Sequence, residues 1–239
     1  MSKDVIVFTN ENNHEDLDSC NRELLSGYRR LDKESQIRES RAFVEKMVTR
    51  RSIRNFSTES VPLEIIQNAV RVAGTAPSGA NKQPWYFAIV CNQALKTRIR
   101  VCAEREETQF YSHRAPTEWL NDLKPFGTDA NKPHLGKAPY LIAVFAELYG
   151  TNGQSDRKTS HYYVSESVGI AVGMLITALH LSGLGTLTHT PSPMRFLNDL
   201  LGLPRRFRPI VIVAVGFPEE PILVPKLSKK TLDEISKVY

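Results

Sequence analysis

RRSIR at residues 50–54, followed by TAPSGAN at residues 75–81, is the most informative part of the sequence. The first stretch places three guanidinium groups within five residues, with a serine hydroxyl between them. Arginine makes forked, charge-assisted bonds to phosphate oxygens, so these residues form a dense donor set for a dianionic phosphate. In the second stretch the small turn Pro77, Ser78 and Gly79 would let a flat ligand lie against backbone N–H groups. A basic cluster alone is more often a solvated face. Its pairing with the small-residue turn favours a phosphate-bearing ligand.

Both motifs, at this spacing, resemble those of the nitroreductase-like FMN flavoproteins, and in detail those of the iodotyrosine deiodinase branch. The resemblance extends from about residue 41 to the C-terminus. It implies an α+β fold, with a mixed sheet flanked by helices, in a domain-swapped homodimer that binds FMN at the subunit interface. The residues that it assigns to the phosphate and ribityl chain of FMN are Arg50, Arg51, Ser52 and Arg54. It assigns the border of the isoalloxazine ring to the turn at residues 77–79.

Composition limits the function classes. The 239 residues are one large domain or two small ones, and 41% hydrophobic and 24% charged residues are ordinary for a soluble globular protein. The net charge is +5 with the basic residues spread along the chain, so nucleic-acid binding is not indicated. Cys20, Cys91 and Cys102 lack metal or redox spacing, which favours a reducing compartment, and we expect Cys91 to pack in the core. No cluster of ligand residues has metal spacing, so no metal is expected.

Hydropathy predicts no membrane segment. The N-terminal residues contain no apolar stretch of signal-peptide length. The longest apolar tract, within residues 168–181, is interrupted by Gly169, Gly173 and His180. Animal members of the deiodinase branch carry a membrane anchor, and no such anchor is found in this sequence. The expectation is a cytoplasmic protein without membrane or nucleic-acid partners.

Apolar periodicity predicts helices and buried strands that alternate along the chain. The expected helices cover residues 34–49, 63–73, 94–111 and 161–181. The expected strands cover residues 86–91, 139–146, 186–188 and 210–215. Residues 150–158 are expected to form a loop. This alternation indicates an α/β or α+β class around one sheet and leaves the strand order open.

The expected domain organisation has an arm, a body, a lid and a tail. Residues 1–36 are polar and irregular and are expected to form an N-terminal arm, while residues 37–239 form a single FMN-binding domain. The stretch at about 105–135 is charged and interrupted by prolines, which is typical of a mobile lid. The resemblance implies that the extension at about 220–239 reaches across to the other subunit.

A threonine-rich segment follows the short strand near residue 187. Thr188, His189 and Thr190 precede Pro191, and by themselves they indicate ordinary turn chemistry. The resemblance implies that the three residues border the flavin and that Thr190 is the catalytic residue, with its hydroxyl bonded to flavin N5. A donor there favours the one-electron-reduced flavin, which reductive removal of a halogen requires. His189 replaces the middle residue of the family's run of threonines, so its side-chain contact is expected to differ while a backbone contact survives.

Three residues of the lid point to an amino-acid ligand. Glu107 and Tyr111 are four residues apart, hence on one helix face, and Lys132 follows 21 residues after Tyr111. Alone they read as solvated side chains. Both spacings, however, match the Glu, Tyr and Lys with which deiodinases clamp a zwitterionic amino acid. The resemblance implies that Glu107 takes the ammonium, Lys132 takes the carboxylate and Tyr111 covers the ring, and that general nitroreductases lack this set. Binding would order the lid and exclude water.

Two further positions follow from the same resemblance. Ala80 matches the position whose backbone N–H meets the substrate phenolate oxygen, which favours halotyrosines over tyrosine because ortho halogens acidify the phenol. Lys229 stands where the family usually has an arginine that reaches the FMN phosphate. Lysine keeps the charge and loses the fork, and the alternative is that Lys229 is a solvated tail residue.

The sequence therefore predicts an FMN-dependent reductive dehalogenase of 3-halotyrosines that works as a homodimer. Its electrons would come from NAD(P)H or from an NAD(P)H-dependent reductase. One alternative is a broad-specificity NAD(P)H nitroreductase or quinone reductase. Another is a flavin-binding protein without turnover.

Overall fold

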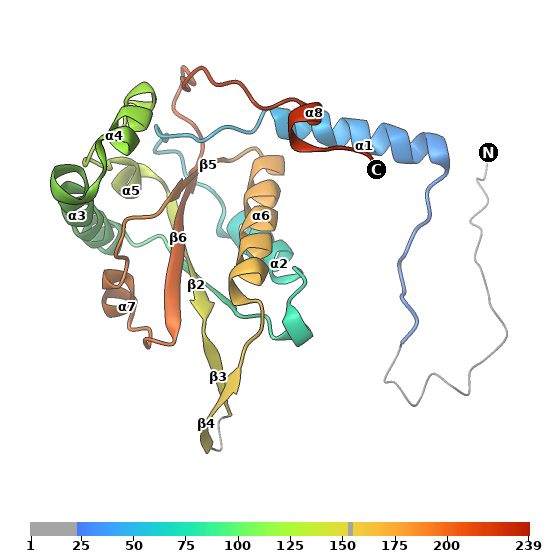
Figure 1. The fold of residues 1–239 in the computed structure, drawn as a ribbon, viewed down its shortest axis with the longest axis horizontal. Helices are drawn as coiled ribbons and strands as arrows, with labels where there is room; N and C mark the ends of the chain where they lie inside the picture. The colour runs from blue at the N-terminus through green and yellow to red at the C-terminus, as the bar shows by residue number, and fades with distance from the viewer. Residues whose placement is uncertain (1–22, 153–154) are drawn as a thin grey trace. The chain divides into compact units, whose positions relative to one another are not determined.

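The computed structural model describes residues 23–152 and 155–239. Residues 45–239 form one compact unit, which contains the sheet and all of the helices after α1 (Figure 1). Helix α1 (Lys33–Val48) agrees with the prediction for residues 34–49. Most of the predicted N-terminal arm lies outside the described residues, so that arm stays a prediction.

The sheet has the order β1-β2-β6-β5. Its strands are β1 (Trp85–Val90), β2 (Tyr140–Glu147), β5 (Gly185–His189) and β6 (Phe207–Gly216). These strands pair antiparallel with one another, and a parallel bridge joins Ser52 to Thr186 at the β5 edge. The two central strands are near-continuous apolar runs, because helices cover both faces of the sheet. The predicted α+β class and its helix-flanked sheet are confirmed.

Alternation along β2 divides the core into two layers. Leu141, Ala143 and Phe145 face one cluster, built with α3 (Gln93–Gln109), α5 (His134–Lys137) and α7 (Phe196–Leu201). Ile142 and Val144 face the other cluster, built with α2 (Leu63–Gly74) and α6 (Val164–Leu181). Figure 1 shows these two groups of helices on opposite sides of the strands. The first layer carries the lid, and the second carries the turn at residues 77–80.

Short elements complete the chain. They are the 3-10 turn η2 (Gly79–Asn81), the π-helix η3 (Phe110–Arg114), α4 (Thr117–Leu123), the 3-10 turn η4 (Lys124–Phe126), and α8 (Leu232–Ile235). Together η3, α4 and η4 span the middle of the predicted lid.

Two expectations about individual segments are wrong. The stretch predicted as a loop at residues 150–158 belongs to an antiparallel hairpin of β3 (Tyr149–Asn152) and β4 (Ser155–Ser160). The polar composition of this stretch led to the loop prediction. The Asn-Gly pair at residues 152–153 is, however, a strong sequence signal for a hairpin turn. Cys91 does not pack in the core: it follows β1 directly and is exposed.

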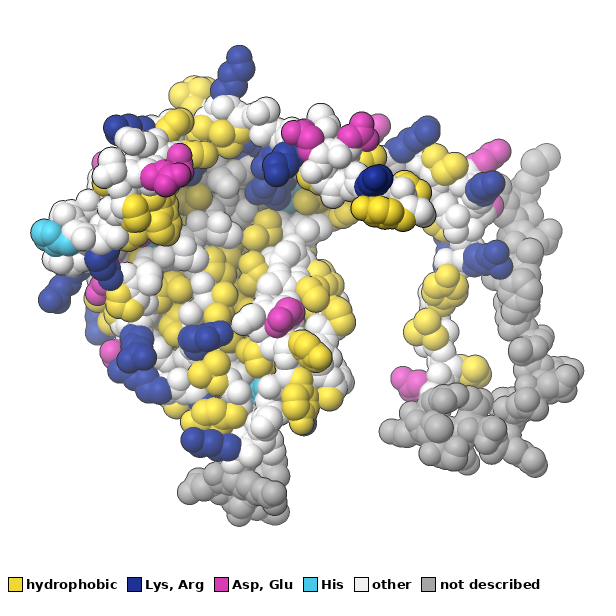
Figure 2. Space-filling model, viewed as in Figure 1, with side chains coloured by type: hydrophobic (Ala, Val, Ile, Leu, Met, Phe, Trp, Pro, Cys, Tyr) yellow, Lys and Arg dark blue, Asp and Glu magenta, His cyan; other side chains and the backbone are white. Residues whose placement is uncertain are grey.

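Helix α6 has two different faces. Val168, Ala171 and Leu175 are buried against α2 and the sheet, whereas Ile170 is 46% exposed and a Cβ at Gly173 would meet nothing within 4 Å. Figure 2 shows hydrophobic side chains on the exposed face over α6. By length and composition alone, α6 could cross a membrane, contrary to the expectation drawn from its interruptions. Its packed face is that of a core helix, and its open face has no partner within the described chain.

Candidate functional site

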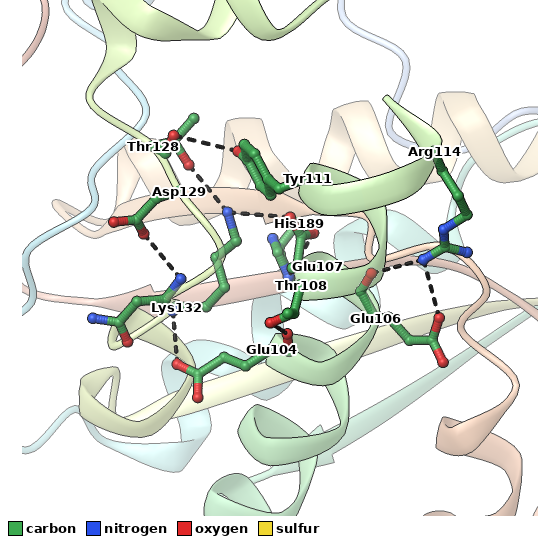
Figure 3. Close-up of polar contacts among 11 residues, drawn as sticks. Glu104, Glu106, Glu107, Thr108, Tyr111, Arg114, Thr128, Asp129, Lys132 and His189 are labelled. Atoms are coloured by element: carbon green, nitrogen blue, oxygen red, sulfur yellow. Dashed lines mark hydrogen bonds and ion pairs between the residues drawn. The ribbon is translucent and has the colours of Figure 1, made fainter. Parts of the chain in front are cut away.

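The acid, the phenol and the amine of the predicted lid lie together. Glu107 Oε2 is 3.3 Å from Lys132 Nζ, and the two side chains are only 12% and 5% exposed. Lys132 Nζ also donates to Thr128 Oγ1 at 3.1 Å and lies 5.3 Å from the centre of the Tyr111 ring. In Figure 3 these side chains point toward one another across the gap between α3 and the segment at residues 128–132. The structure therefore brings three of the four predicted substrate residues into one cluster, whereas the fourth, Ala80, is in the turn η2 (Gly79–Asn81).

A change of helix type sets the position of Tyr111. The α-helix ends at Gln109 and continues as the π-helix η3, in which the N–H of Ala115 bonds to the carbonyl of Phe110. Single π turns are frequent at functional sites because the extra residue redirects the side chains. Here the Tyr111 hydroxyl reaches the carbonyl of Thr128 at 3.4 Å, so the lid closes on itself. The sequence analysis did not identify Thr128, because residues 128–132 are not helical and a spacing of four residues predicts no contact there.

His189 turns away from its two threonine neighbours. Thr188 and Thr190 are exposed and His189 is buried, as alternation along β5 requires. The His189 Nε2 is 3.7 Å from Glu107 Oε1, and the His189 ring is edge-on to the ring of His134 at 5.3 Å between centres. The histidine thus belongs to the lid cluster and leaves the exposed face of the segment to the hydroxyls.

The buried histidines are held neutral. Burial lowers the pKa of His189 to about 3, and the neighbouring His134 and Lys132 act in the same direction. Burial likewise lowers the pKa of His134 to about 4, with Lys132 and Arg54 adding to the effect. Among the described residues neither Nε2 atom has a hydrogen-bond partner. The Glu107 carboxylate therefore faces one cation, Lys132, and one neutral imidazole.

A hollow of about 170 Å³ adjoins this cluster. Arg54, Thr188 and Lys132 line it together with His134 and His189. The guanidinium of Arg54 also lies 5.9 Å from the centre of the Phe126 ring, in η4 of the lid. One arginine of the RRSIR stretch is thus brought to the predicted substrate residues and to the threonine segment.

The other arginines of the stretch line a second cavity of about 220 Å³. Residues 50–54 run along the edge of β5, where the N–H of Ile53 bonds to the carbonyl of Thr186. Arg50 and Arg51 line this cavity with His180 and other residues at the C-terminal end of α6. The Arg51 guanidinium also donates to the carbonyl of Pro225.

The small-residue turn packs against the other end of the same helix. A Cβ at Gly79 would lie 2.9 Å from the carbonyl oxygen of Tyr162, just before α6 begins. Ala80 has φ 50° and ψ 33°, a left-handed conformation, and the Ser78 hydroxyl accepts a bond from the N–H of Gln83 at 2.9 Å. Left-handed backbone at a non-glycine residue is uncommon and is often retained where function needs it.

The two motifs that predicted a single flavin site therefore lie far apart within one chain. Helix α6 has 18 residues, so its two ends are separated by about 27 Å at 1.5 Å per residue. Residues 77–80 are at its start, and Arg50 and Arg51 are at its end. Lys229 is exposed in the segment before α8, and its reach to a phosphate stays a prediction. One chain brings Glu107, Tyr111 and Lys132 together beside Arg54, and it separates the turn at residues 77–80 from the arginines at residues 50–51.

Comparison with known proteins gives three findings. The sequence model of the Nitroreductase family matches residues 47–217. An iodotyrosine deiodinase of Haliscomenobacter hydrossis is 46% identical over 209 residues, covering 87% of this chain and 94% of that protein. Iodotyrosine deiodinase 1 of Homo sapiens is 41% identical over 202 residues, covering 83% of this chain and 69% of that protein.

Among solved structures, an oxidized iodotyrosine deiodinase bound to FMN and 3-iodo-L-tyrosine is 35% identical, with a TM-score of 0.68, and covers 80% of this chain and 97% of that one. A BluB-like flavoprotein from Clostridium difficile is 21% identical with a TM-score of 0.62, covers 82% of this chain and 98% of that one, and shows the fold alone.

Proposed function

The chain belongs to the nitroreductase family and, within it, to the iodotyrosine deiodinase branch, and on this premise we propose that it is an FMN-dependent reductive dehalogenase of halogenated tyrosines. The observation that carries the proposal is the cluster of the largely buried Glu107–Lys132 ion pair with the partly buried Tyr111 ring. An acid, a phenol and an amine that converge beside a hollow suit a zwitterion attached to an aromatic ring. Reduction of a nitro group or a quinone requires none of them.

The residues present fit FMN. Arg50, Arg51 and Ser52 offer forked and hydroxyl donors for a phosphate, and Arg54 stands beside the hollow that Thr188 lines. FMN supplies the two electrons with which a carbon–halogen bond becomes a carbon–hydrogen bond, a change that also takes up one proton and releases halide. The roles that we propose for Thr190 and Lys229 are a hydroxyl donor to flavin N5 and a cation for the phosphate.

The substrate would enter by exchanging partners with an existing ion pair. Glu107 and Lys132 neutralise each other in the closed lid. An amino acid presents an ammonium to Glu107 and a carboxylate to Lys132, so each buried charge keeps an opposite charge when the pair separates. Because His189 is neutral, it does not compete with the ammonium for Glu107. Tyr111 would cover the ring, and the N–H of Ala80 would bond the phenolate oxygen.

A homodimer would complete the site. The arginines and the 77–80 turn are at opposite ends of α6, and the open face of that helix carries Ile170, Gly169 and Gly173. In a two-fold contact between these faces the two copies of α6 would run antiparallel. The turn at the start of one helix would then lie beside the arginines at the end of the other. The same symmetry would let the extension at about 220–239 reach the partner. We also propose a cytoplasmic location with electrons from NAD(P)H or an NAD(P)H-dependent reductase.

Titration and turnover test the proposal. 3-Iodotyrosine added to the FMN-loaded protein should perturb the flavin absorbance at micromolar concentration, and the dithionite-reduced protein should release one iodide per substrate consumed. A nitroaromatic compound is the comparison substrate. Turnover of the nitroaromatic without binding of iodotyrosine would replace the proposal with a general nitroreductase. Failure of both would leave a flavin-binding protein.

A further inference from the structure

One face of α3 carries a series of polar side chains that hold the segment at residues 131–139. They lie three or four residues apart and so follow a single helix face. Their contacts are Gln93 Nε2 to the carbonyl of Gly136 at 3.1 Å, Lys96 Nζ to the carbonyl of Ala138 at 2.7 Å, Arg100 Nη2 to Asn131 Oδ1 at 2.9 Å, and Glu104 Oε1 to the N–H of Lys132 at 2.7 Å. Glu107 continues the series with its ion pair to Lys132.

Glu104 is the member of this series that holds the backbone of a substrate residue. Its Oε1 accepts from the N–H of Lys132 and from Arg100 Nε, each at 2.7 Å. The Glu104 side chain is 25% exposed. A bond from an N–H to a carboxylate is charge-assisted, and it is shorter and stronger than a neutral one. Figure 3 shows Glu104 and Glu107 one turn apart on α3, with Lys132 alongside both.

The two carboxylates contact opposite ends of one lysine. Glu104 and Glu107 are separated by three residues, about 4.5 Å along the helix axis. Glu104 holds the backbone N–H of Lys132, and Glu107 holds its ammonium at 3.3 Å. The amine of the cluster is therefore fixed at both ends to the helix that carries the acid.

We propose that Glu104 is a positioning residue for amino-acid recognition. It fixes the backbone of Lys132 to α3 and thereby sets the separation between the amine that receives the substrate carboxylate and the acid that receives the ammonium. The inference rests on the proposed function, because it assumes that the cluster binds a zwitterion. Glu104 itself touches neither substrate nor cofactor in this scheme.

Three variants test it. Glu104→Ala removes the acceptor for the Lys132 N–H, and Glu104→Gln keeps a side-chain carbonyl there without the charge. Glu106→Ala is the matched control, because Glu106 is on the same helix, is 28% exposed and also pairs with an arginine, Arg114 at 3.2 Å, away from Lys132. Each variant is purified with FMN bound, and the flavin-to-protein ratio shows that it is folded.

Two ligands separate positioning from general damage. 3-Iodotyrosine carries the zwitterion, and 2-iodophenol has the same halogenated ring without it. Glu104→Ala should weaken iodotyrosine binding about 10- to 100-fold, the equivalent of one hydrogen bond to a charged group, and leave iodophenol binding unchanged. Glu104→Gln and Glu106→Ala should stay within about threefold of the parent. Equal losses for both ligands, or for Glu104→Ala and Glu106→Ala, would overturn the proposal.

Amide hydrogen exchange of the ligand-free holoprotein tests the anchor independently. Peptides that contain Lys132 should exchange faster in Glu104→Ala than in the parent, with Glu104→Gln in between and Glu106→Ala unchanged. Unchanged exchange in Glu104→Ala would refute the anchor whatever the ligand data give. If exchange rises while the parent protein binds no iodotyrosine, the proposed function fails, and with it the role in recognition.

Discussion

The residues of the lid cluster lie together within one chain, whereas the two flavin motifs lie apart. Glu107 and Lys132 form a buried pair within one chain. The arginines at residues 50–51 and the turn at residues 77–80 lie at opposite ends of α6. The first region is built across neighbouring elements of one layer, whereas the second is divided by the length of a helix. Under the proposed function, the charged end of the substrate would be selected within one chain, and the cofactor site would be completed by a second copy.

The largest effect is expected from placing a charged side chain on the exposed face of α6, where the second copy is proposed to bind. Ile170 is 46% exposed on α6, so Ile170→Arg should leave the fold of the chain intact. If two copies meet there, the variant buries an unpaired charge, and we expect loss of the dimer and a fall in FMN affinity of about 100-fold or more. Light scattering and the flavin-to-protein ratio measure both effects. Val101→Arg, at a 60% exposed position of α3, is the control and should change neither.

Mixed dimers make the same test sharper. Arg51→Ala damages the arginine half, and Gly79→Val damages the turn half, where even a Cβ would lie 2.9 Å from a backbone oxygen. Each variant alone should bind little FMN. Mixed and refolded together, they form heterodimers in which one of the two sites has both halves intact, so flavin binding should partly return. No recovery would contradict a site shared between chains.

The sequence predicted the elements better than the distance between the motifs. Strands such as β2 and β6 are continuous apolar runs, so their positions follow from hydropathy. The lid cluster was predicted from the resemblance to the deiodinases, because the spacing of Glu107, Tyr111 and Lys132 alone reads as solvated side chains. The two flavin motifs are close in sequence, however, and this closeness did not predict that they lie at opposite ends of α6. That separation depends on how α2 and α6 pack, which is a long-range property of the core.

The side-chain direction of His189 could have been predicted, and the contacts of Glu104 could not. Alternation on a short strand places Thr188 outside and His189 inside, and this needs only the strand assignment. The bond from Glu104 to the backbone of Lys132 joins residues that are 28 positions apart. No local pattern specifies it, because a backbone N–H has no sequence signature. The π-helix η3 could not be predicted either, because its composition fits an α-helix equally well.

The next largest effect should come from separating the buried charges. Lys132→Gln leaves Glu107 without its cation in a site where the side chain is 12% exposed. We expect iodotyrosine binding to fall about 100-fold and the free energy of unfolding to fall by about 3 kcal/mol. FMN binding should be retained, because Lys132 belongs to the lid cluster and is not one of the residues proposed to bind FMN. Calorimetric titration with iodotyrosine, beside urea unfolding, measures both. Unchanged iodotyrosine affinity would refute the clamp.

Acidification should lower the free energy of unfolding of the chain through the two buried histidines, His134 and His189. The pKa values of His189 and His134 are lowered to about 3 and about 4 in the folded chain, so between these values and about 6.5 the unfolded chain binds more protons. Their contribution to stability is therefore complete above about pH 6.5 and is lost as the pH falls toward 4 and 3. At pH 5 the loss is on the order of 2 kcal/mol per histidine relative to pH 7.

Urea unfolding at pH 7 and pH 5 tests this dependence. His189→Gln removes one of the two buried imidazoles and should make the loss of stability on acidification smaller by about the contribution of one histidine. His113→Gln, at an exposed position of the lid, should have the same pH dependence as the parent. A parent protein as stable at pH 5 as at pH 7 would show that the two histidines are not held neutral by burial.

The smallest effect is expected at Lys229 in the C-terminal tail, the proposed last cation for the FMN phosphate. Lys229 is exposed in the single chain, so any bond that it makes to a phosphate would be solvated and worth little. Lys229→Ala should weaken FMN binding about threefold to fivefold, and Lys229→Arg should strengthen it by a similar factor, because the guanidinium restores the fork. Fluorescence titration of the apoprotein with FMN, at low and high salt, measures both changes. The nearby Lys237→Ala is the control. If Lys229→Ala and Lys237→Ala behave alike, the tail contributes only general charge, and RRSIR alone holds the phosphate.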